Sequence, residues 1–140
     1  QSSAAELLRY RRAIGADHVQ VWADVKKKHS SHAITADVDI GETAHAVEFM
    51  RGDAVIVTGA VTGDAPQPAD LHAVKQATRL PVYLGSGVTA KNIGAFLGEA
   101  DGFIVGSEFK TGGHWSGNVD AKRVGRFMSA VFASQAPARK

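Results

Sequence analysis

Three polar residues with acid–base chemistry lie close together near the start of the chain. Asp24 comes at the end of an apolar run, and Lys28 and His29 follow shortly after it. A carboxylate, an amine and an imidazole in one site can transfer protons, and a lysine can also bind an anion or form a Schiff base. A solvated basic loop is the opposing interpretation, because Lys26, Lys27 and Lys28 are consecutive. We predict catalytic roles for Asp24, Lys28 and His29.

A second set of residues has the composition of a phosphate site. Two apolar runs end in glycine turns, Leu84-Gly85-Ser86-Gly87 and Val105-Gly106-Ser107. Glycine lets backbone N–H groups approach phosphate oxygens, and a helix predicted after the first turn would add the positive end of its dipole. Glycines that serve only tight turns are the alternative. We predict that these residues and one threonine bind substrate or phosphate: Thr58, Gly85, Ser86, Gly87, Gly106 and Ser107.

Metal and redox chemistry have less support in the sequence. His29 and His32 are spaced as two ligands on one helix turn would be, but no third ligand can be identified. No Gly-x-Gly-x-x-Gly fingerprint follows a predicted strand, as a dinucleotide site would need. We therefore predict no metal and no cofactor, and isomerase, aldolase or lyase chemistry.

His114 and Trp115 follow the last apolar run on a glycine-rich loop. They suit stacking on a ligand ring or closure over a ligand, and equally an exposed loop with a buried tryptophan anchor. The sequence does not choose between these interpretations.

Alternating strands and helices must position these residues. Apolar runs closed by glycine or polar residues predict strands at Val19–Val25, Ala54–Thr58, Val82–Gly85 and Gly102–Gly106. Helical patterns occur at Ala4–Ile14, Thr43–Met50, Pro68–Thr78, Ala90–Glu99 and Ala121–Ala133. Thr89 and Asp120 suit the N-caps of the last two helices. This alternation is typical of a parallel sheet.

Two α/β architectures fit, an open doubly wound sheet and a (β/α)₈ barrel. Side chains alternate along a strand, so Trp22 and Asp24 face away from Val21 and Ala23. A doubly wound sheet is apolar on both faces, so the polar face favours a TIM (β/α)₈ barrel. A barrel has about 250 residues, and the chain supplies only half of one, which we assign to residues 1–134 with a frayed tail at 135–140.

Composition bounds the class of protein. The chain has 140 residues, of which 44% are hydrophobic and 21% charged, with no cysteine. These values exclude a disordered chain and a disulfide scaffold. No transmembrane segment or signal peptide is found, so we expect a cytoplasmic protein. The net charge of +2 does not suggest a nucleic-acid partner. Expected partners are a phosphorylated small molecule and either an N-terminal half-barrel or a second copy that closes the barrel.

The segments taken together resemble the BtpA/SgcQ family from about Leu7 to Phe132. Gly-Ser-Gly and Val-Gly-Ser occur in many phosphate-binding barrels, whereas their combination with Ala-Asp-Val, Lys-His and Val-Thr-Gly is specific. The resemblance is carried by Val21–Val25, Lys28-His29, Asp53–Gly59, Pro81–Thr89 and Asp101–Ser107. It implies that the chain is similar to the C-terminal half of a barrel, strands five to eight.

The resemblance implies two kinds of function. Some members of the family look like enzymes of sugar or nucleotide metabolism, which would make this chain part of an isomerase, aldolase or lyase for a small phosphorylated metabolite. The photosynthetic members imply a non-catalytic factor for photosystem I biogenesis, with peripheral association at the thylakoid. We favour the enzyme and keep the assembly factor as the alternative.

Overall fold

The computed structural model describes residues 3–25, 37–59 and 65–135 of the chain. Its α-helices are α1 (Ala4–Ala13), α2 (Ile40–Phe49), α3 (Pro68–Ala77) and α4 (Ala121–Gln135). Its strands are β1 (Trp22–Asp24), β2 (Ala54–Val57), β3 (Val82–Leu84) and β4 (Gly102–Phe103). Short 3-10 turns follow β3 and β4: η2 (Ile93–Ala95), η3 (Ser107–Phe109) and η4 (Thr111–Gly113).

The strands form one parallel sheet in the order β1-β2-β3-β4. Each strand lies within its predicted apolar run and is shorter than that run. The predicted α/β class with alternating strands and helices is therefore confirmed. Within the described part of the chain the sheet is open, with β1 and β4 as its edges, so barrel closure is not seen.

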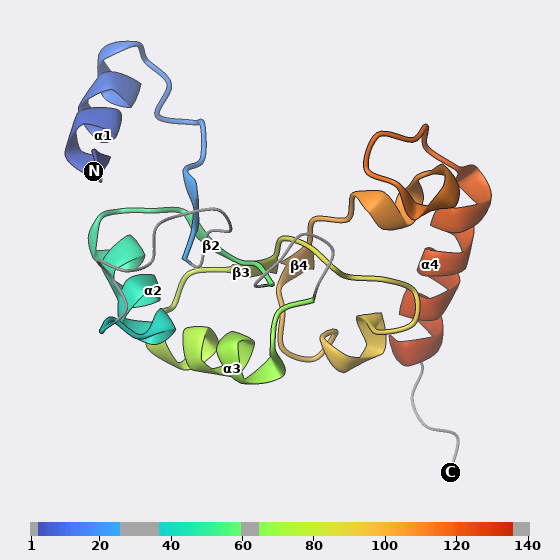
Figure 1. Ribbon diagram of the computed structural model, residues 1–140. Coiled ribbons are helices and arrows are strands. Elements are labelled where there is room, and N and C mark those ends of the chain that lie inside the picture. The colour runs from blue at the N-terminus through green and yellow to red at the C-terminus, as the bar shows by residue number, and fades with distance from the viewer. Residues whose placement is uncertain (1–2, 26–36, 60–64, 136–140) are drawn as a thin grey trace.

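Helices α2 and α3 pack together and lie along one side of the sheet (Figure 1). Their apolar side chains meet the side chains that β2 and β3 direct to that side, which are less than 2% exposed. Here the core contains Ala44, Val55, Val57, Leu71, Val74, Val82 and Leu84, and the same buried cluster continues to Val88, Ile93, Phe96 and Phe127. Burial of these branched side chains fixes the register of the two central strands.

The opposite side of the sheet, here called the open face, carries Trp22, Asp24, Ile56, Tyr83 and Ile104. Strand register places Asp24 beside Ile56 and Ile56 beside Tyr83, so these side chains share one side. Trp22 and Ile104 are 39% and 43% exposed. The open face is thus apolar over its centre and has a carboxylate at one end.

The predicted helix at Ala90–Glu99 is wrong. The segment forms turns around η2, whose N-cap position is Asn92, so there is no helix for Thr89 to cap. The Asn92 side chain accepts a hydrogen bond from the Thr89 N–H at 2.7 Å and donates to the Gly87 carbonyl at 2.9 Å. These bonds favour a turn, and the glycines at 94 and 98 lower helix propensity further.

The other helix predictions differ from the structure mainly at their ends. Asp120 caps α4 as predicted, because its carboxylate accepts the N–H of Lys122 at 2.9 Å. Helix α2 begins earlier than predicted, at a capping box in which Asp39 and Glu42 exchange side-chain and backbone hydrogen bonds. Helix α4 ends at Gln135, the first residue of the predicted tail.

Candidate functional site

The predicted site residues that the structure describes lie at one edge of the sheet. All strands are parallel, so their carboxyl ends meet at the same edge. Asp24 ends β1, Thr58 follows β2, Gly85 follows β3, and Gly106 lies shortly after β4. Ligands of open and closed α/β sheets bind at this edge.

Asp24 and Thr58 form a polar pair on the open face. The Thr58 hydroxyl is 3.3 Å from Oδ1 and 3.4 Å from Oδ2 of Asp24. Thr58 is buried, whereas Asp24 is exposed. The hydroxyl therefore orients a carboxylate that solvent or a ligand can reach, as alternation along the first strand predicts.

Lys28 and His29 lie outside the described residues, as does His32. The catalytic roles of Lys28 and His29 stay predictions. The described residues contain no group of three or more His, Cys, Asp or Glu side chains that could hold a metal ion.

The glycine turns after β3 and β4 line one pocket of about 490 Å³, here called the glycine pocket. It brings together five of the six residues predicted to bind phosphate. Thr58 is not among its lining residues and lies instead beside Asp24. The lining consists of Gly85, Ser86, Gly87, Val88, Thr89, Ile104, Gly106, Ser107, Glu108, Gly113, His114 and Trp115.

The backbone N–H groups of the glycine pocket are not equivalent. The Gly85 N–H donates to the Val57 carbonyl at 2.8 Å as part of the sheet, so it is not available to a ligand. The N–H groups of Gly87, Gly106 and Ser107 donate to no acceptor in the described part of the chain. Since η2 is only one turn, the expected helix dipole is also missing. Any anion here would depend on individual amides.

Side-chain contacts hold the two glycine turns together. Glu108 accepts hydrogen bonds from the Ala90 N–H at 3.3 Å and from the Arg123 guanidinium at 3.0 Å. The Arg123 Nε also donates to the Glu108 carbonyl at 2.6 Å. Arg123 belongs to α4, whose Phe127 packs edge-on against Phe109, with ring centroids 5.2 Å apart. Helix α4 thus fixes the wall of the glycine pocket.

Sequence reasoning missed the contributions of Glu108 and Arg123. They are 15 residues apart, and no periodic pattern relates a residue of a turn to one on the following helix. The available signal was a lone acidic residue directly after Gly106-Ser107. For His114 and Trp115 the sequence left open ligand stacking, closure over a ligand, or a loop with a buried tryptophan anchor. Both line the glycine pocket, and Trp115 is 70% exposed, so the buried anchor is wrong.

Carboxylates with lowered pKa values lie at the other end of the sheet. The Val21 N–H and Arg11 lower the pKa of Asp53, and Lys75 and the Val82 N–H lower that of Asp101. Both aspartates directly precede a strand. At 2.7 Å, Asp53 accepts the N–H of Val21, the residue before β1, and Asp101 accepts the N–H of Val82, the first residue of β3. These groups stabilise the sheet and are remote from the glycine pocket.

Comparisons with known proteins agree with the resemblance found in the sequence. The model of the BtpA family matches residues 1–133. An uncharacterized mitochondrial protein of Caenorhabditis elegans is 44% identical over 128 residues, which are 91% of this chain and 46% of the relative. The photosystem I biogenesis protein BtpA of Synechocystis is 36% identical over 132 residues, 94% of this chain and 45% of the relative.

An uncharacterized protein of Pyrococcus abyssi is 36% identical over 131 residues, 94% of this chain and 49% of the relative. The chain thus spans about half the length of the curated relatives it matches. No solved structure matches it. None of the described helices is long and apolar enough to cross a membrane. The family match covers nearly the whole sequence, and the chain belongs to the BtpA family.

Proposed function

We propose that the chain forms part of an enzyme that binds a small phosphorylated metabolite at the carboxyl edge of its sheet. The observation that carries the proposal is the glycine pocket, because Gly87, Gly106 and Ser107 line one cavity and their N–H groups donate to no acceptor among the described residues. Oriented backbone amides of this kind are typical phosphate ligands. The pocket volume of about 490 Å³ lies in the range of small-molecule sites.

Asp24 would act on the part of the substrate remote from the phosphate. Two strand spacings of about 4.8 Å separate β1 from β3, so a small metabolite can reach from the glycine pocket to the Asp24 carboxylate. Lys28 and His29 follow Asp24 in the sequence and are its proposed partners in proton transfer or carbonyl activation. Isomerase, aldolase and lyase reactions use such groups.

The proposed enzyme needs a second half. The chain spans about half of its relatives, and the open face leaves Trp22 and Ile104 partly in water. We propose that the chain forms strands five to eight of a (β/α)₈ barrel over residues 1–134. The remaining half would come from an N-terminal segment or from a second copy. In either arrangement the open face becomes the barrel interior and Asp24 lies at its mouth.

A titration of the 140-residue chain with inorganic phosphate and ribose 5-phosphate tests the site. Ser107→Asp places a negative charge beside the proposed phosphate position, and Ser107→Ala is its neutral control. Because bringing like charges together costs several kcal/mol, we expect Ser107→Asp to weaken the binding of ribose 5-phosphate at least about tenfold. Ser107→Ala should bind as the unmodified chain does. Equal binding by both variants would place the phosphate elsewhere.

A non-catalytic role in photosystem I biogenesis is the second candidate. It rests on the 36% identity with the Synechocystis protein of that name. Asp24→Asn and Lys28→Met in a full-length protein that contains this chain separate the candidates. An enzyme would lose turnover while its circular dichroism spectrum stays unchanged. An assembly factor would keep supporting photosystem I accumulation in cyanobacteria that lack their own BtpA.

A further inference from the structure

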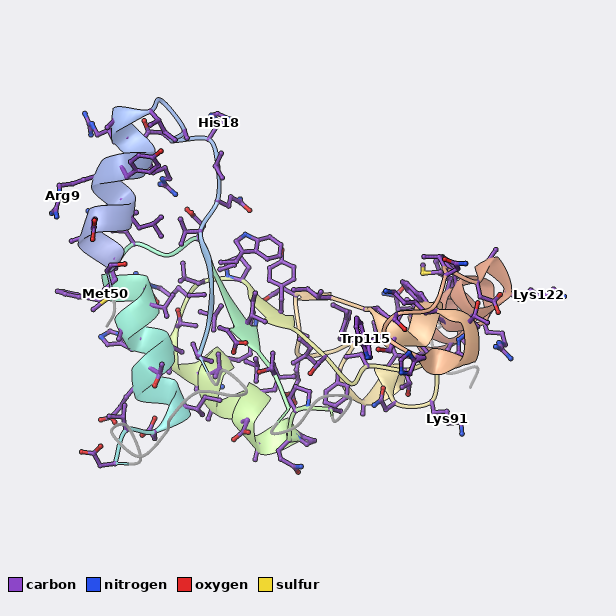
Figure 2. All side chains as sticks on the ribbon, turned by 45° about the horizontal axis from the view of Figure 1, so that its top comes forward. Arg9, His18, Met50, Lys91, Trp115 and Lys122 are labelled. Carbon is purple, nitrogen blue, oxygen red and sulfur yellow. The ribbon has the colours of Figure 1, made fainter. Side chains whose placement is uncertain are left out.

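Trp115 is a large aromatic side chain left in solvent at the rim of the glycine pocket. It is 70% exposed, although tryptophan is usually mostly buried. The His114 ring lies beside it, with ring centroids 5.8 Å apart and planes tilted by 34°. Figure 2 shows Trp115 between the sheet and α4, the region where the glycine turns lie.

The backbone around Trp115 is held by hydrogen bonds. The Lys110 ammonium donates to the Trp115 carbonyl. The Thr111 N–H donates to the Asn118 carbonyl at 2.8 Å, and the Gly117 N–H donates to the His114 carbonyl at 3.0 Å. The indole is therefore exposed on a loop whose conformation is already fixed. Preorganisation of this kind lowers the entropic cost of binding a ligand.

Among the described residues, the lining of the glycine pocket contains no lysine or arginine. Its one acidic residue, Glu108, is paired with Arg123 at 3.0 Å. A phosphate would thus meet neutral amides, whose attraction for an anion is weaker than that of a cationic side chain. Affinity and selectivity would then come from another part of the ligand, to which the pocket offers the apolar side chains of Val88 and Ile104 and the aromatic surface of Trp115.

We infer that Trp115 selects phosphomonoesters that carry a planar ring, of the nucleoside monophosphate class. The inference rests on the proposed function, because the phosphate must occupy the amides of Gly87, Gly106 and Ser107. The ring then stacks on the Trp115 indole at the rim, where it also covers apolar surface. Trp115 is a specificity-determining residue in this arrangement and takes no part in the chemical step.

Calorimetric titrations of the 140-residue chain with AMP, UMP and ribose 5-phosphate test the inference. Stacking of a base on an aromatic side chain is favourable enough that Trp115→Ala should weaken the binding of AMP at least about tenfold. Ribose 5-phosphate has no planar ring, so its affinity should change less than about twofold. Trp22→Phe is the matched control, since Trp22 lies on the open face and does not line the pocket. This variant should not change the affinity for either ligand.

Fluorescence gives a second measurement that does not depend on Trp115→Ala folding. The chain has two tryptophans, so Trp22→Phe leaves Trp115 as the sole indole. AMP and UMP should then quench its emission, and ribose 5-phosphate should not. Unchanged AMP affinity in Trp115→Ala, or AMP binding without quenching, would overturn the inference. Binding of ribose 5-phosphate in the same experiments would still support the proposed phosphate site. Failure of every ligand to bind would overturn both proposals.

Discussion

The indole of Trp22 stacks on the ring of Tyr83 across the strand that separates them, with ring centroids 4.2 Å apart and planes 20° from parallel. Trp22 is on β1 and Tyr83 on β3, and the residue of β2 beside Trp22 is the small Ala54. A side chain at Gly102 of β4 would clash with the Tyr83 ring. Small residues on β2 and β4 thus make room for an aromatic layer over the open face.

The open face should make the isolated chain associate. It presents apolar side chains that solvent reaches, including Trp22 and Ile104, and exposed apolar patches of this kind mark interfaces. We expect light scattering to give at least twice the chain mass of 14.7 kDa. Trp22→Lys should shift the mass toward the monomer, and Phe49→Lys, on an exposed position of α2, should not. A stable monomer of the unmodified chain would contradict the half-barrel proposal.

Leu71 should be a main contributor to stability. Its side chain is 1% exposed between α3 and the sheet. Leu71→Ala removes buried methyl groups and leaves a cavity, so we expect a loss of about 2–5 kcal/mol in the free energy of unfolding. Leu7→Ala on α1, at a position that is 46% exposed, is the matched control and should cost much less. Urea denaturation measures both, and similar losses would show that α3 is not packed as described.

The Glu48 carboxylate should make the free energy of unfolding depend on pH in the acidic range. The N–H of Arg79, the Thr78 hydroxyl and the Arg79 guanidinium lower the pKa of Glu48 from 4.5 to about 2. Above pH 4.5 the carboxylate is charged in the folded and unfolded chains, and its stabilisation is fully present. As the pH falls from 4.5 to about 2, the unfolded chain binds the proton first and the stabilisation is lost.

The variant Glu48→Gln tests this dependence. It should lower the free energy of unfolding at neutral pH and flatten its decline between pH 4.5 and about 2. Chemical denaturation at a series of pH values measures the slope. A slope identical to that of the unmodified chain would mean that the contacts of Glu48 with Thr78 and Arg79 do not hold in solution.

Substitution of Gly87 should destabilise the chain because of the backbone conformation at this position. Its φ is +67°, a left-handed conformation that costs a side-chain-bearing residue about 1–2 kcal/mol. Gly87→Ala should destabilise the chain by that amount. Gly106→Ala is the control in the other glycine turn, because its φ is −109° and no atom lies within 4 Å of the added Cβ. Thermal melts of the two variants should differ, and equal melting temperatures would contradict the turn geometry at Gly87.

Local patterns in the sequence were sufficient for the α/β class and for the order of the strands along the chain. Short apolar runs closed by glycine predicted β2 and β3, and alternation along the first strand placed Trp22 and Asp24 on one side. The cap at Asp120 was also predictable, since its carboxylate bonds within its own turn. These features depend on neighbours in the sequence, and so the sequence by itself determined them.

Tertiary structure decided which donors and side chains the site contains. The Gly85 N–H is used by Val57 of the adjacent strand. Glu108 and Arg123 meet because α4 packs back on the turn after β4. Such contacts join residues far apart in the chain, whose approach is fixed only when the elements pack.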